Sequence, residues 1–287
     1  SRGQGPYVIE KPQQAASVFF SYLRGQIETY VQKHELPQEL VYSVSVPAAF
    51  EANQRQDLCD ALREAGIVVP PFGIIDEPNA AFIGYIFETL SRGNAIFEFL
   101  KERKRNVLVF DFGAGTCDIS ILEVGAEDDR FISKNKAISQ FHALGGDNID
   151  RQIVREVLWP QMYEQSTPAA DYTSAEMNLG IIPRLQQEAE RMKRQCCKFI
   201  TNNWDGRTLT PFQTAERKIT GSPIPPFRLR GCELRLDAPT MTFLDFANVM
   251  KPFIDPKMVD SLAIHQEDDL VSIFEPVDNA IGKAGIN

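Results

Sequence analysis

The sequence predicts an α/β fold, and three observations support this expectation. Segments whose apolar residues recur every three or four positions alternate with short strand-like segments through the first half of the chain. An antiparallel strand–turn–strand unit over residues 106–124 would make the sheet mixed. Hydrophobic residues make up 43% of the 287 residues and charged residues 24%, which is ordinary globular usage, and this length suits one large domain or two smaller ones.

The first elements follow from apolar spacing and from the residues that end helices and strands. Apolar residues at helical spacing predict a helix from Pro12 to His34. Alternation predicts a strand over residues 40–46, which Pro47 ends, and a polar-faced helix over residues 51–64 follows. The apolar run over residues 67–75 contains two prolines, so it predicts a short buried strand and a turn.

A second group of elements surrounds a glycine-containing turn. Asp76-Glu77-Pro78 begins a helix, with proline in the first turn and acids at the positive end of the helix dipole. The charged segment 94–105 connects this helix to a buried strand. The strands and turn of this unit are expected at residues 106–110, 111–116, 117–124 and 131–141.

The second half of the chain is expected to be mainly helical. Apolar spacing predicts helices over residues 145–163, 178–199, 243–264 and 271–282. A polar loop over residues 164–174, and a region of short strands and turns over residues 201–239, separate them.

Composition excludes several classes of protein. The net charge of −9 argues against a nucleic-acid binder, because affinity for phosphate backbones depends on clustered Lys and Arg. The five cysteines are too scattered for a disulfide framework, so we expect reduced thiols and a cytoplasmic location. No apolar stretch approaches the length of a membrane helix, so no membrane partner is expected.

The sharpest motif is the turn between two strands, with the sequence Asp111-Phe112-Gly113-Ala114-Gly115-Thr116. Glycines in such a turn let backbone N–H groups approach phosphate oxygens, and the Thr116 hydroxyl can add a donor. Asp111 ends a buried strand and Asp118 lies in the returning strand, so both carboxylates suit a hydrated Mg²⁺ ion. A strand follows the turn, which excludes the P-loop and the dinucleotide fingerprint, and a plain hairpin turn remains an alternative.

Two further features lie at expected helix starts. Gly145 and Gly146 precede a helix and would offer free N–H groups at its positive end, although an ordinary turn explains them equally. Glu77 lies at a strand-to-helix junction, where a carboxylate can orient a water for phosphoryl transfer or simply cap the helix.

A fourth feature is one face of the helix over residues 178–199. Its four members recur at i, i+3, i+4 and i+7, and they are Glu190, Lys193, Arg194 and Cys197. Arg194 can stack on a base while Glu190 and Lys193 reach a ribose, and a solvated charged face is the alternative.

These features occur together and in this order in a known family. The chain resembles the nucleotide-binding domain of the seventy-kilodalton heat-shock chaperones (DnaK-type), within the actin-like ATPase (ribonuclease H-like) superfold, clearly over about residues 6–197. The matching stretches are Val44-Ser45-Val46-Pro47-Ala48-Ala49-Phe50 with Gln54-Arg55-Gln56, Ile74-Ile75-Asp76-Glu77-Pro78-Asn79-Ala80-Ala81, Asn106 to Ser120, Leu144-Gly145-Gly146-Asp147-Asn148-Ile149-Asp150 and Glu190-Arg191-Met192-Lys193-Arg194.

The resemblance implies a role for each matching position. Phosphates of ATP or ADP would be held by Gly113, Ala114, Gly115 and Thr116, Mg²⁺ would lie near Asp111 and Asp118, and Glu77 and Asp111 would be catalytic. The second lobe would contact the nucleotide through Gly145 and Gly146, and Glu190, Lys193, Arg194 and Cys197 would line the adenosine pocket. Pro47 and Arg55 match a pair that relays nucleotide state to the substrate-binding domain of the family.

Several positions depart from the family pattern. Ala114 replaces a third glycine, which would cost roughly 1–2 kcal/mol in left-handed geometry and little otherwise. Cys197 replaces a serine. The first phosphate hairpin, its catalytic lysine and the glycine-rich adenosine motif of the family have no counterpart in the sequence, so we expect little ATP hydrolysis by this chain itself.

The resemblance implies an incomplete two-lobed domain with mixed sheets flanked by helices. Residues 1–105 would be part of the first lobe, 106–146 the second-lobe core sheet with the phosphate hairpin, 147–240 an upper subdomain, and 241–287 further helices. The favoured function is part of a stress-response chaperone ATPase that acts on client polypeptides with cochaperones. A non-catalytic module of the same fold and, less favoured, a sugar or acid kinase remain alternatives.

Overall fold

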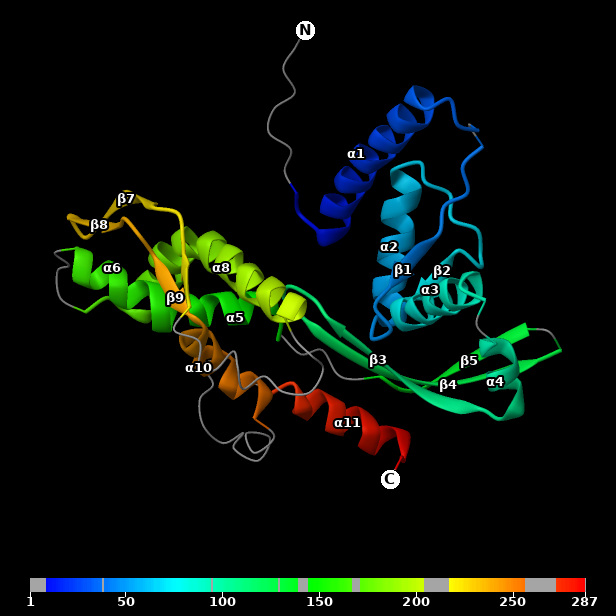
Figure 1. Cartoon of the computed structure of the whole chain (residues 1–287). Coiled ribbons are helices and arrows are strands. Elements are labelled where there is room, and N and C mark those ends of the chain that lie inside the picture. The colour runs from blue at the N-terminus through cyan, green and yellow to red at the C-terminus, as the bar shows by residue number, and fades with distance from the viewer. Residues whose placement is uncertain are drawn as a thin grey trace, which may run out of the picture. The chain divides into compact units, whose positions relative to one another are not determined.

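The computed structural model describes residues 9–37, 39–93, 95–128, 130–138, 144–166, 171–203, 217–255 and 272–286. The chain divides into two compact units (Figure 1). Unit 1 comprises residues 1–109 together with 120–138, and unit 2 comprises residues 110–119 together with 139–287. The hairpin over residues 105–127 is therefore divided between the units. Its turn lies within residues 110–119 of unit 2, and the rest of its two strands belongs to unit 1.

Unit 1 begins with helices packed beside a short parallel strand pair. The elements that lie wholly or partly in this unit are α1 (Pro12–Lys33), β1 (Val44–Val46), α2 (Ala52–Glu64), β2 (Ile74–Asp76), α3 (Glu77–Ser91), α4 (Ile96–Glu102), β3 (Arg105–Phe112), β4 (Cys117–Glu127) and β5 (Arg130–Ile138). Helix α1 packs on α2, and β1 pairs with β2 in parallel, with Val44 opposite Ile74. The three helices that apolar spacing and caps predict at the start of the chain are thereby confirmed.

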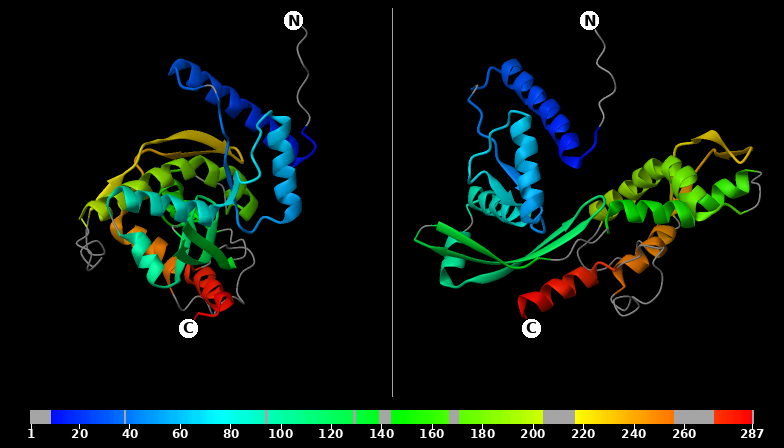
Figure 2. Two further views of the ribbon diagram at one scale, coloured as in Figure 1. Left: turned by 90° about the vertical axis from the view of Figure 1, so that its right-hand side faces the viewer. Right: turned by 180° about the vertical axis from the view of Figure 1, so that it is seen from behind.

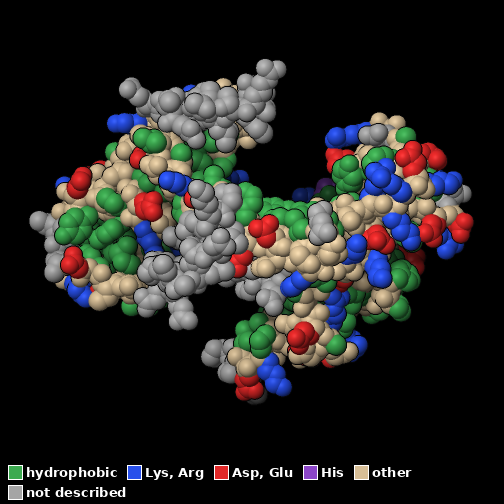
Figure 3. Space-filling model, turned by 90° about the horizontal axis from the view of Figure 1, so that it is seen from below, with side chains coloured by type: hydrophobic (Ala, Val, Ile, Leu, Met, Phe, Trp, Pro, Cys, Tyr) green, Lys and Arg blue, Asp and Glu red, His purple; other side chains and the backbone are tan. Residues whose placement is uncertain are grey.

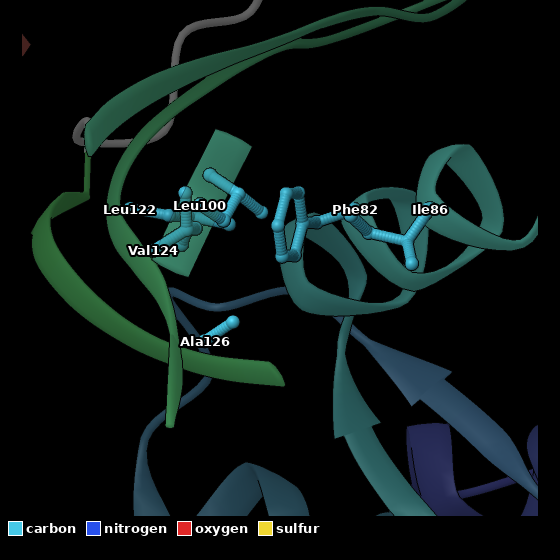
Figure 4. Close-up of a cluster of buried hydrophobic side chains, with 6 residues drawn as sticks. All are labelled: Phe82, Ile86, Leu100, Leu122, Val124 and Ala126. Carbon is cyan, nitrogen blue, oxygen red and sulfur yellow. The ribbon is translucent and has the colours of Figure 1, made fainter. Parts of the chain in front are cut away.

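The core of unit 1 lies between the β3–β4–β5 sheet and helices α3 and α4. Phe82 and Ile86 are one helical turn apart on α3, and they pack with Leu100 against the β4 side chains of Leu122 and Val124 (Figure 4). All five are almost fully buried. This cluster fixes the antiparallel β4–β5 pair against α3, the helix that begins at Glu77.

The strands differ from expectation in extent and in pairing. Of the strand expected over residues 40–46, only residues 44–46 pair with another strand, because β2 has only three residues to pair with them. Parallel pairing (β1–β2) and antiparallel pairing (β4–β5) both occur, but the described residues place them in separate sheets rather than in one mixed sheet. Strand β3 extends through Phe112, so Asp111 lies within the strand and the turn begins at Gly113.

Unit 2 is built on two long helical segments packed side by side (Figures 1 and 2). The elements are α5 (Gly146–Ile153), a π-helical turn η1 (Val154–Leu158), α6 (Trp159–Gln165), α7 (Ser174–Glu176), a π-helical turn η2 (Met177–Ile181), α8 (Ile182–Asn203), β6 (Lys218–Thr220), β7 (Ile224–Leu229), β8 (Cys232–Leu236), β9 (Thr240–Thr242), α10 (Phe243–Ile254) and α11 (Phe274–Ala284). Side chains such as Ile153, Leu158, Leu185 and Met192 are fully buried.

Short antiparallel ladders complete unit 2. Strand β6 pairs with β9, and β7 pairs with β8. The expected helix over residues 243–264 ends at Ile254, and its remaining part from residue 256 lies outside the described residues. Residues 139–141, which end the strand expected over 131–141, also lie outside the described residues. So does residue 271, the first residue of the helix expected over 271–282.

Apolar side chains also reach the surface between the charged ones (Figure 3). Phe19 and Tyr22 on α1, and Phe87 on α3, are each more than half exposed. None of the described helices combines the length and the apolar character that a membrane span requires.

Candidate functional site

The glycine-containing turn between β3 and β4 is closed by a backbone hydrogen bond. The Gly113 N–H donates to the Thr116 carbonyl at 2.8 Å. Among the described residues, the non-glycine residues with positive φ are Glu35, Asp128 and Arg230. Ala114 is not one of them, so an alanine fits here without the cost of left-handed geometry.

The tip of this turn presents unused backbone donors. Within the described part of the chain, the N–H groups of Ala114, Gly115 and Thr116 make no hydrogen bond. The Thr116 hydroxyl lies on the same turn, and nothing occupies the space where a Gly115 Cβ would stand. Successive free N–H groups in a turn are the donors that an anion-binding concavity needs, and the phosphate site at this turn stays a prediction.

The start of α5 docks directly on this turn. The Gly146 N–H donates to the Gly113 carbonyl at 3.0 Å, and the Asp147 N–H donates to the Ala114 carbonyl at 2.7 Å. The Gly145 N–H donates to the Asn148 side chain at 2.9 Å. The expectation that Gly145 and Gly146 offer free N–H groups is therefore wrong, because the turn and the cap already use them.

The close approach explains why glycine stands at position 145. A Cβ there would lie 2.6 Å from the carbonyl carbon of Ala114, 2.8 Å from the Gly115 nitrogen, and closer still to the Ala114 oxygen. All three are backbone atoms, so no side-chain rotation can relieve the clash. The glycine pair thus positions the turn, whether or not it contacts a ligand.

Two carboxylates flank the turn. Asp111 is exposed at the end of β3, and Asp118 is partly buried on β4. Burial raises the pKa of the intervening Cys117 thiol to about 11, and the negative charges of Asp118 and Asp111 add to this shift. No cluster of three or more acidic, His or Cys side chains suited to a metal exists within the described ranges. A pair of carboxylates does fit a Mg²⁺ ion that keeps most of its waters.

A lysine from α8 reaches the helix start beside the turn. The Lys193 ammonium donates to the Gly146 carbonyl at 2.9 Å and to the Asp150 carboxylate at 2.9 Å. Asp150 is 2% exposed, and its other carboxylate oxygen has no partner in the described structure. Burial raises the pKa of Asp150, and the hydrogen bond from Lys193 opposes this shift.

The other three members of the predicted α8 face are more exposed. Arg194 and Glu190 form an ion pair of 3.5 Å, with side chains 77% and 50% exposed. Cys197 is an exposed residue as well. The structure therefore brings Lys193 to the turn region, and it leaves Glu190, Arg194 and Cys197 open to solvent on the same helix.

The remaining predicted residues belong to unit 1. Glu77 is the first residue of α3 and follows the N-cap Asp76. Arg55 donates to the carbonyls of Phe50 at 3.0 Å and Pro47 at 3.4 Å, and it pairs with Asp76 at 2.7 Å. The predicted pair Pro47 and Arg55 is thus in direct contact, at the junction that leads into Glu77.

Two groups of residues have structural roles that the sequence did not reveal. Asp150, within the Gly145–Gly146 stretch, is the counterion of Lys193. In unit 1, Asn135 donates to Asp76 at 3.0 Å and accepts from Asn79 at 3.1 Å, which extends the Arg55 network into β5. The only sequence signal for Asp150 is its place one helical turn after the glycine pair.

Comparison with known proteins identifies the family. A sequence model described as "Hsp70 protein" matches residues 7–216. The chain is 34% identical over 154 residues to a heat shock cognate HSP70 protein of Trypanosoma brucei brucei, covering 54% of this chain and 20% of the relative. It is 32% identical over 187 residues to a chaperone protein dnaK of Thalassiosira pseudonana, covering 64% of this chain and 26% of the relative.

The matched region contains both the turn and the helix start that docks on it, together with Lys193 and the Arg55 network. The alignments span only about a fifth to a quarter of the length of these relatives. Because the family match covers well over half of the chain, the protein belongs to the Hsp70 family, with the actin-like ATPase fold that this family implies.

Proposed function

We propose that the 113–116 turn of unit 2 binds the phosphates of ATP or ADP with Mg²⁺. The observation that carries this proposal is the set of free N–H groups of Ala114, Gly115 and Thr116, held on a turn whose neighbouring helix has its own donors engaged. Free backbone donors beside two carboxylates suit a phosphate–metal complex, since the donors meet phosphate oxygens and the carboxylates meet the hydrated ion.

The remaining site residues receive complementary roles. Asp111 and Asp118 would hold Mg²⁺ through its waters, and the ion would neutralise phosphate charge. Lys193 uses two of its three N–H donors on Gly146 and Asp150, so its third donor is available to a ribose hydroxyl or a phosphate.

The exposed α8 residues Glu190, Arg194 and Cys197 would line the adenosine side of the site. Gly145 and Gly146 would contact the nucleotide through their Cα surfaces, because their N–H groups are engaged.

Two further roles that the family resemblance implies fall on residues of unit 1. Glu77 would orient the attacking water in hydrolysis. Pro47 and Arg55 would transmit the nucleotide state, since Arg55 connects the loop after β1 to Asp76, the residue before Glu77. We assign hydrolysis, client polypeptides and cochaperones to the longer protein. Its location would be a reducing compartment such as the cytoplasm, because all five cysteines are free thiols.

Calorimetry with Mg-ATP and Mg-ADP tests the binding proposal. We expect saturable binding that EDTA weakens and that Asp111→Ala weakens at least about tenfold, which is about 1.4 kcal/mol. Asp278→Ala, which removes an exposed carboxylate on α11, is the matched control and should leave the affinity unchanged. Equal affinity of the Asp111→Ala variant and the unmodified chain would reject the metal role of Asp111.

The two alternatives give different results in the same series. A non-catalytic module would bind nucleotide, and the longer protein would release no phosphate from ATP. A sugar or acid kinase would form ADP faster when a small panel of sugars or carboxylic acids is added.

A further inference from the structure

A chain of hydrogen bonds connects the free Gly115 N–H at the tip of the turn to a lysine of α8. Lys193 donates to the Gly146 carbonyl at 2.9 Å. The N–H of the same peptide unit, on Asp147, donates to the Ala114 carbonyl at 2.7 Å. The Ala114 carbonyl in turn shares its peptide unit with the Gly115 N–H. Two peptide units therefore join the Lys193 ammonium to a free donor of the turn.

The planarity of these peptide units sets the direction of the free donors. No cis peptide bond occurs in the described structure, so the carbonyl and the N–H of each peptide unit point in opposite directions. Because the Ala114 carbonyl faces Asp147 at the start of α5, the Gly115 N–H points away from this helix start. The Ala114 N–H is oriented in the same way, since the Gly113 carbonyl accepts from Gly146.

A cation at one end of this chain strengthens the donor at the other end. Hydrogen bonds in series polarise one another, by roughly 10–30% per bond. The Lys193 ammonium withdraws electron density from the Gly146 carbonyl, so the N–H of that peptide unit becomes a stronger donor to Ala114. The same effect at the Ala114 carbonyl makes the Gly115 N–H a stronger donor to an anion. Lys193 therefore acts on the turn through the backbone at the start of α5.

Asp150 keeps the ammonium at this position. It lies one helical turn after Gly146 on α5, and its side chain leans back toward that residue. Lys193 bridges the two, with bonds of 2.9 Å to the Gly146 carbonyl and to the Asp150 carboxylate. The side chains of Asp150 and Lys193 are 2% and 15% exposed. A Cβ on Gly146 would stand 3.0 Å from the Lys193 nitrogen, so glycine at this position leaves room for the ammonium.

Stability alone does not explain a charged pair at this place. Moving two charges out of water is costly, and apolar side chains of similar volume often stabilise a protein as well or better. The cost is greater here, because the Asp150 Oδ1 atom has no hydrogen-bond partner in the described structure. The position of this costly pair, at the end of a chain that leads to the turn, indicates a role in the site.

A second ion pair of α8 provides the comparison. The Glu188 side chain is 9% exposed and accepts from the Arg191 Nε at 3.0 Å and from the Ser222 N–H at 2.7 Å. Arg191 also donates to the Thr220 carbonyl at 3.4 Å. These partners belong to α8, to β6 and to the segment after β6. The Glu188 carboxylate is therefore nearly as buried as that of Asp150, but its partners are not those that hold the turn.

We propose that Lys193 and Asp150 are positioning residues of the 113–116 turn. Lys193 orients and strengthens the Gly115 N–H through two peptide units, and Asp150 holds the ammonium against the first of them. The inference rests on the proposed binding of nucleotide phosphates at this turn. This contribution of Lys193 is made before the nucleotide arrives and needs no contact with it.

Amide nitrogen chemical shifts of the ligand-free chain test the connection. The shift of an amide nitrogen responds to hydrogen bonding at the carbonyl of its own peptide unit. The double variant Asp150→Asn, Lys193→Met removes the cation and leaves neither partner as an unpaired buried charge. We expect the Asp147 and Gly115 signals to move upfield in this variant. The Thr116 signal is the internal control and should stay, because the carbonyl of its peptide unit accepts no hydrogen bond within the described structure.

Calorimetry with Mg-ADP measures the consequence for binding. Asp150→Asn should weaken Mg-ADP about threefold or more, because the ammonium is no longer held at the Gly146 carbonyl. If Asp150 only offset the charge of Lys193, the same variant would bind the negative ligand more tightly. Glu188→Gln is the matched control: it removes another buried carboxylate charge of unit 2 and should leave the affinity unchanged.

Three results would overturn the proposal. They are unchanged Asp147 and Gly115 signals in the double variant, a shift of the Thr116 signal as large as that of Gly115, and an Asp150→Asn variant that binds Mg-ADP as tightly as the unmodified chain or more tightly. An unmodified chain that does not bind Mg-ADP would reject the proposed function. The chemical shifts, which need no ligand, would then still decide whether the ion pair acts on the turn.

Discussion

Replacing Gly145 with alanine tests how the turn and the α5 helix start are joined. The new Cβ would lie 2.6 Å from the Ala114 carbonyl carbon and 2.8 Å from the Gly115 nitrogen, distances that real side chains do not adopt. If the backbone stays in place, overpacking of this kind costs about 1–3 kcal/mol. If the helix start moves away, the hydrogen bonds from Gly146 and Asp147 to the turn are lost.

The second route has a similar cost. Two backbone hydrogen bonds at about 0.5–1.5 kcal/mol each sum to about 1–3 kcal/mol. Since the protein adopts the less costly arrangement, we expect Gly145→Ala to lower the free energy of unfolding of unit 2 by about 1–3 kcal/mol. Nucleotide affinity should fall as well when the helix start moves away, because the turn then loses the two hydrogen bonds that hold its free N–H groups in place.

Urea unfolding followed by tryptophan fluorescence measures this effect. Both tryptophans, Trp159 and Trp204, belong to unit 2, so the signal reports this unit alone. Gly115→Ala is the control: apart from its chain neighbours, no described atom lies within 4 Å of the new Cβ and the backbone φ is not positive, so its stability should change by less than about 1 kcal/mol. A Gly145→Ala variant as stable as the Gly115→Ala variant would refute the close approach of turn and helix.

The remaining predictions concern ion pairs. Lys193→Met should destabilise unit 2 by about 3–5 kcal/mol, because it leaves the buried Asp150 carboxylate uncompensated. Asp150→Asn should cost less, because Lys193 is partly exposed, and the double variant should cost less than the sum of the two. Burial raises the pKa of Asp150 in the folded state. The stability that Asp150 contributes should therefore fall as the pH rises from the ordinary pKa of an aspartate through this raised pKa. Urea midpoints from about pH 4 to pH 7 should show this slope, and Asp150→Asn should remove it. Arg55→Lys can keep an ion pair with Asp76 but loses the carbonyl contacts, so amide exchange in the β1–α2 loop should accelerate about tenfold, and an unchanged rate would contradict this role.

Local signals in the sequence predict most of the helices and the turn. The first helix ends within one residue of its predicted limit, because apolar spacing and a proline at the start are local features. Proline and an acid likewise mark the start of α3. The turn at 113–116 follows from glycines between two strands, and its boundary was misplaced because Asp111 and Phe112 have strand partners that the sequence does not identify.

Contacts between distant residues explain what the sequence could not show. Lys193 and Asp150 are 43 positions apart, so their pairing depends on how α8 packs on α5. The use of the helix-start donors depends on the docking of Gly146 and Asp147 on the turn, which no spacing rule encodes. The same helix packing decides which side of α8 faces Asp150.

The glycine motif combines two roles, holding the turn in place and offering donors to a ligand, and different N–H groups serve each role. Donors that face the protein, on Gly146 and Asp147, are used to hold the turn in place. Donors at the tip, on Ala114, Gly115 and Thr116, make no hydrogen bond within the described structure. If the turn binds phosphate as proposed, the ligand's oxygens can satisfy the tip without breaking any bond that holds it, so the site would be organised before the ligand arrives. Substitutions at Gly145 should therefore change stability and affinity together, whereas removing Asp111 should change affinity alone.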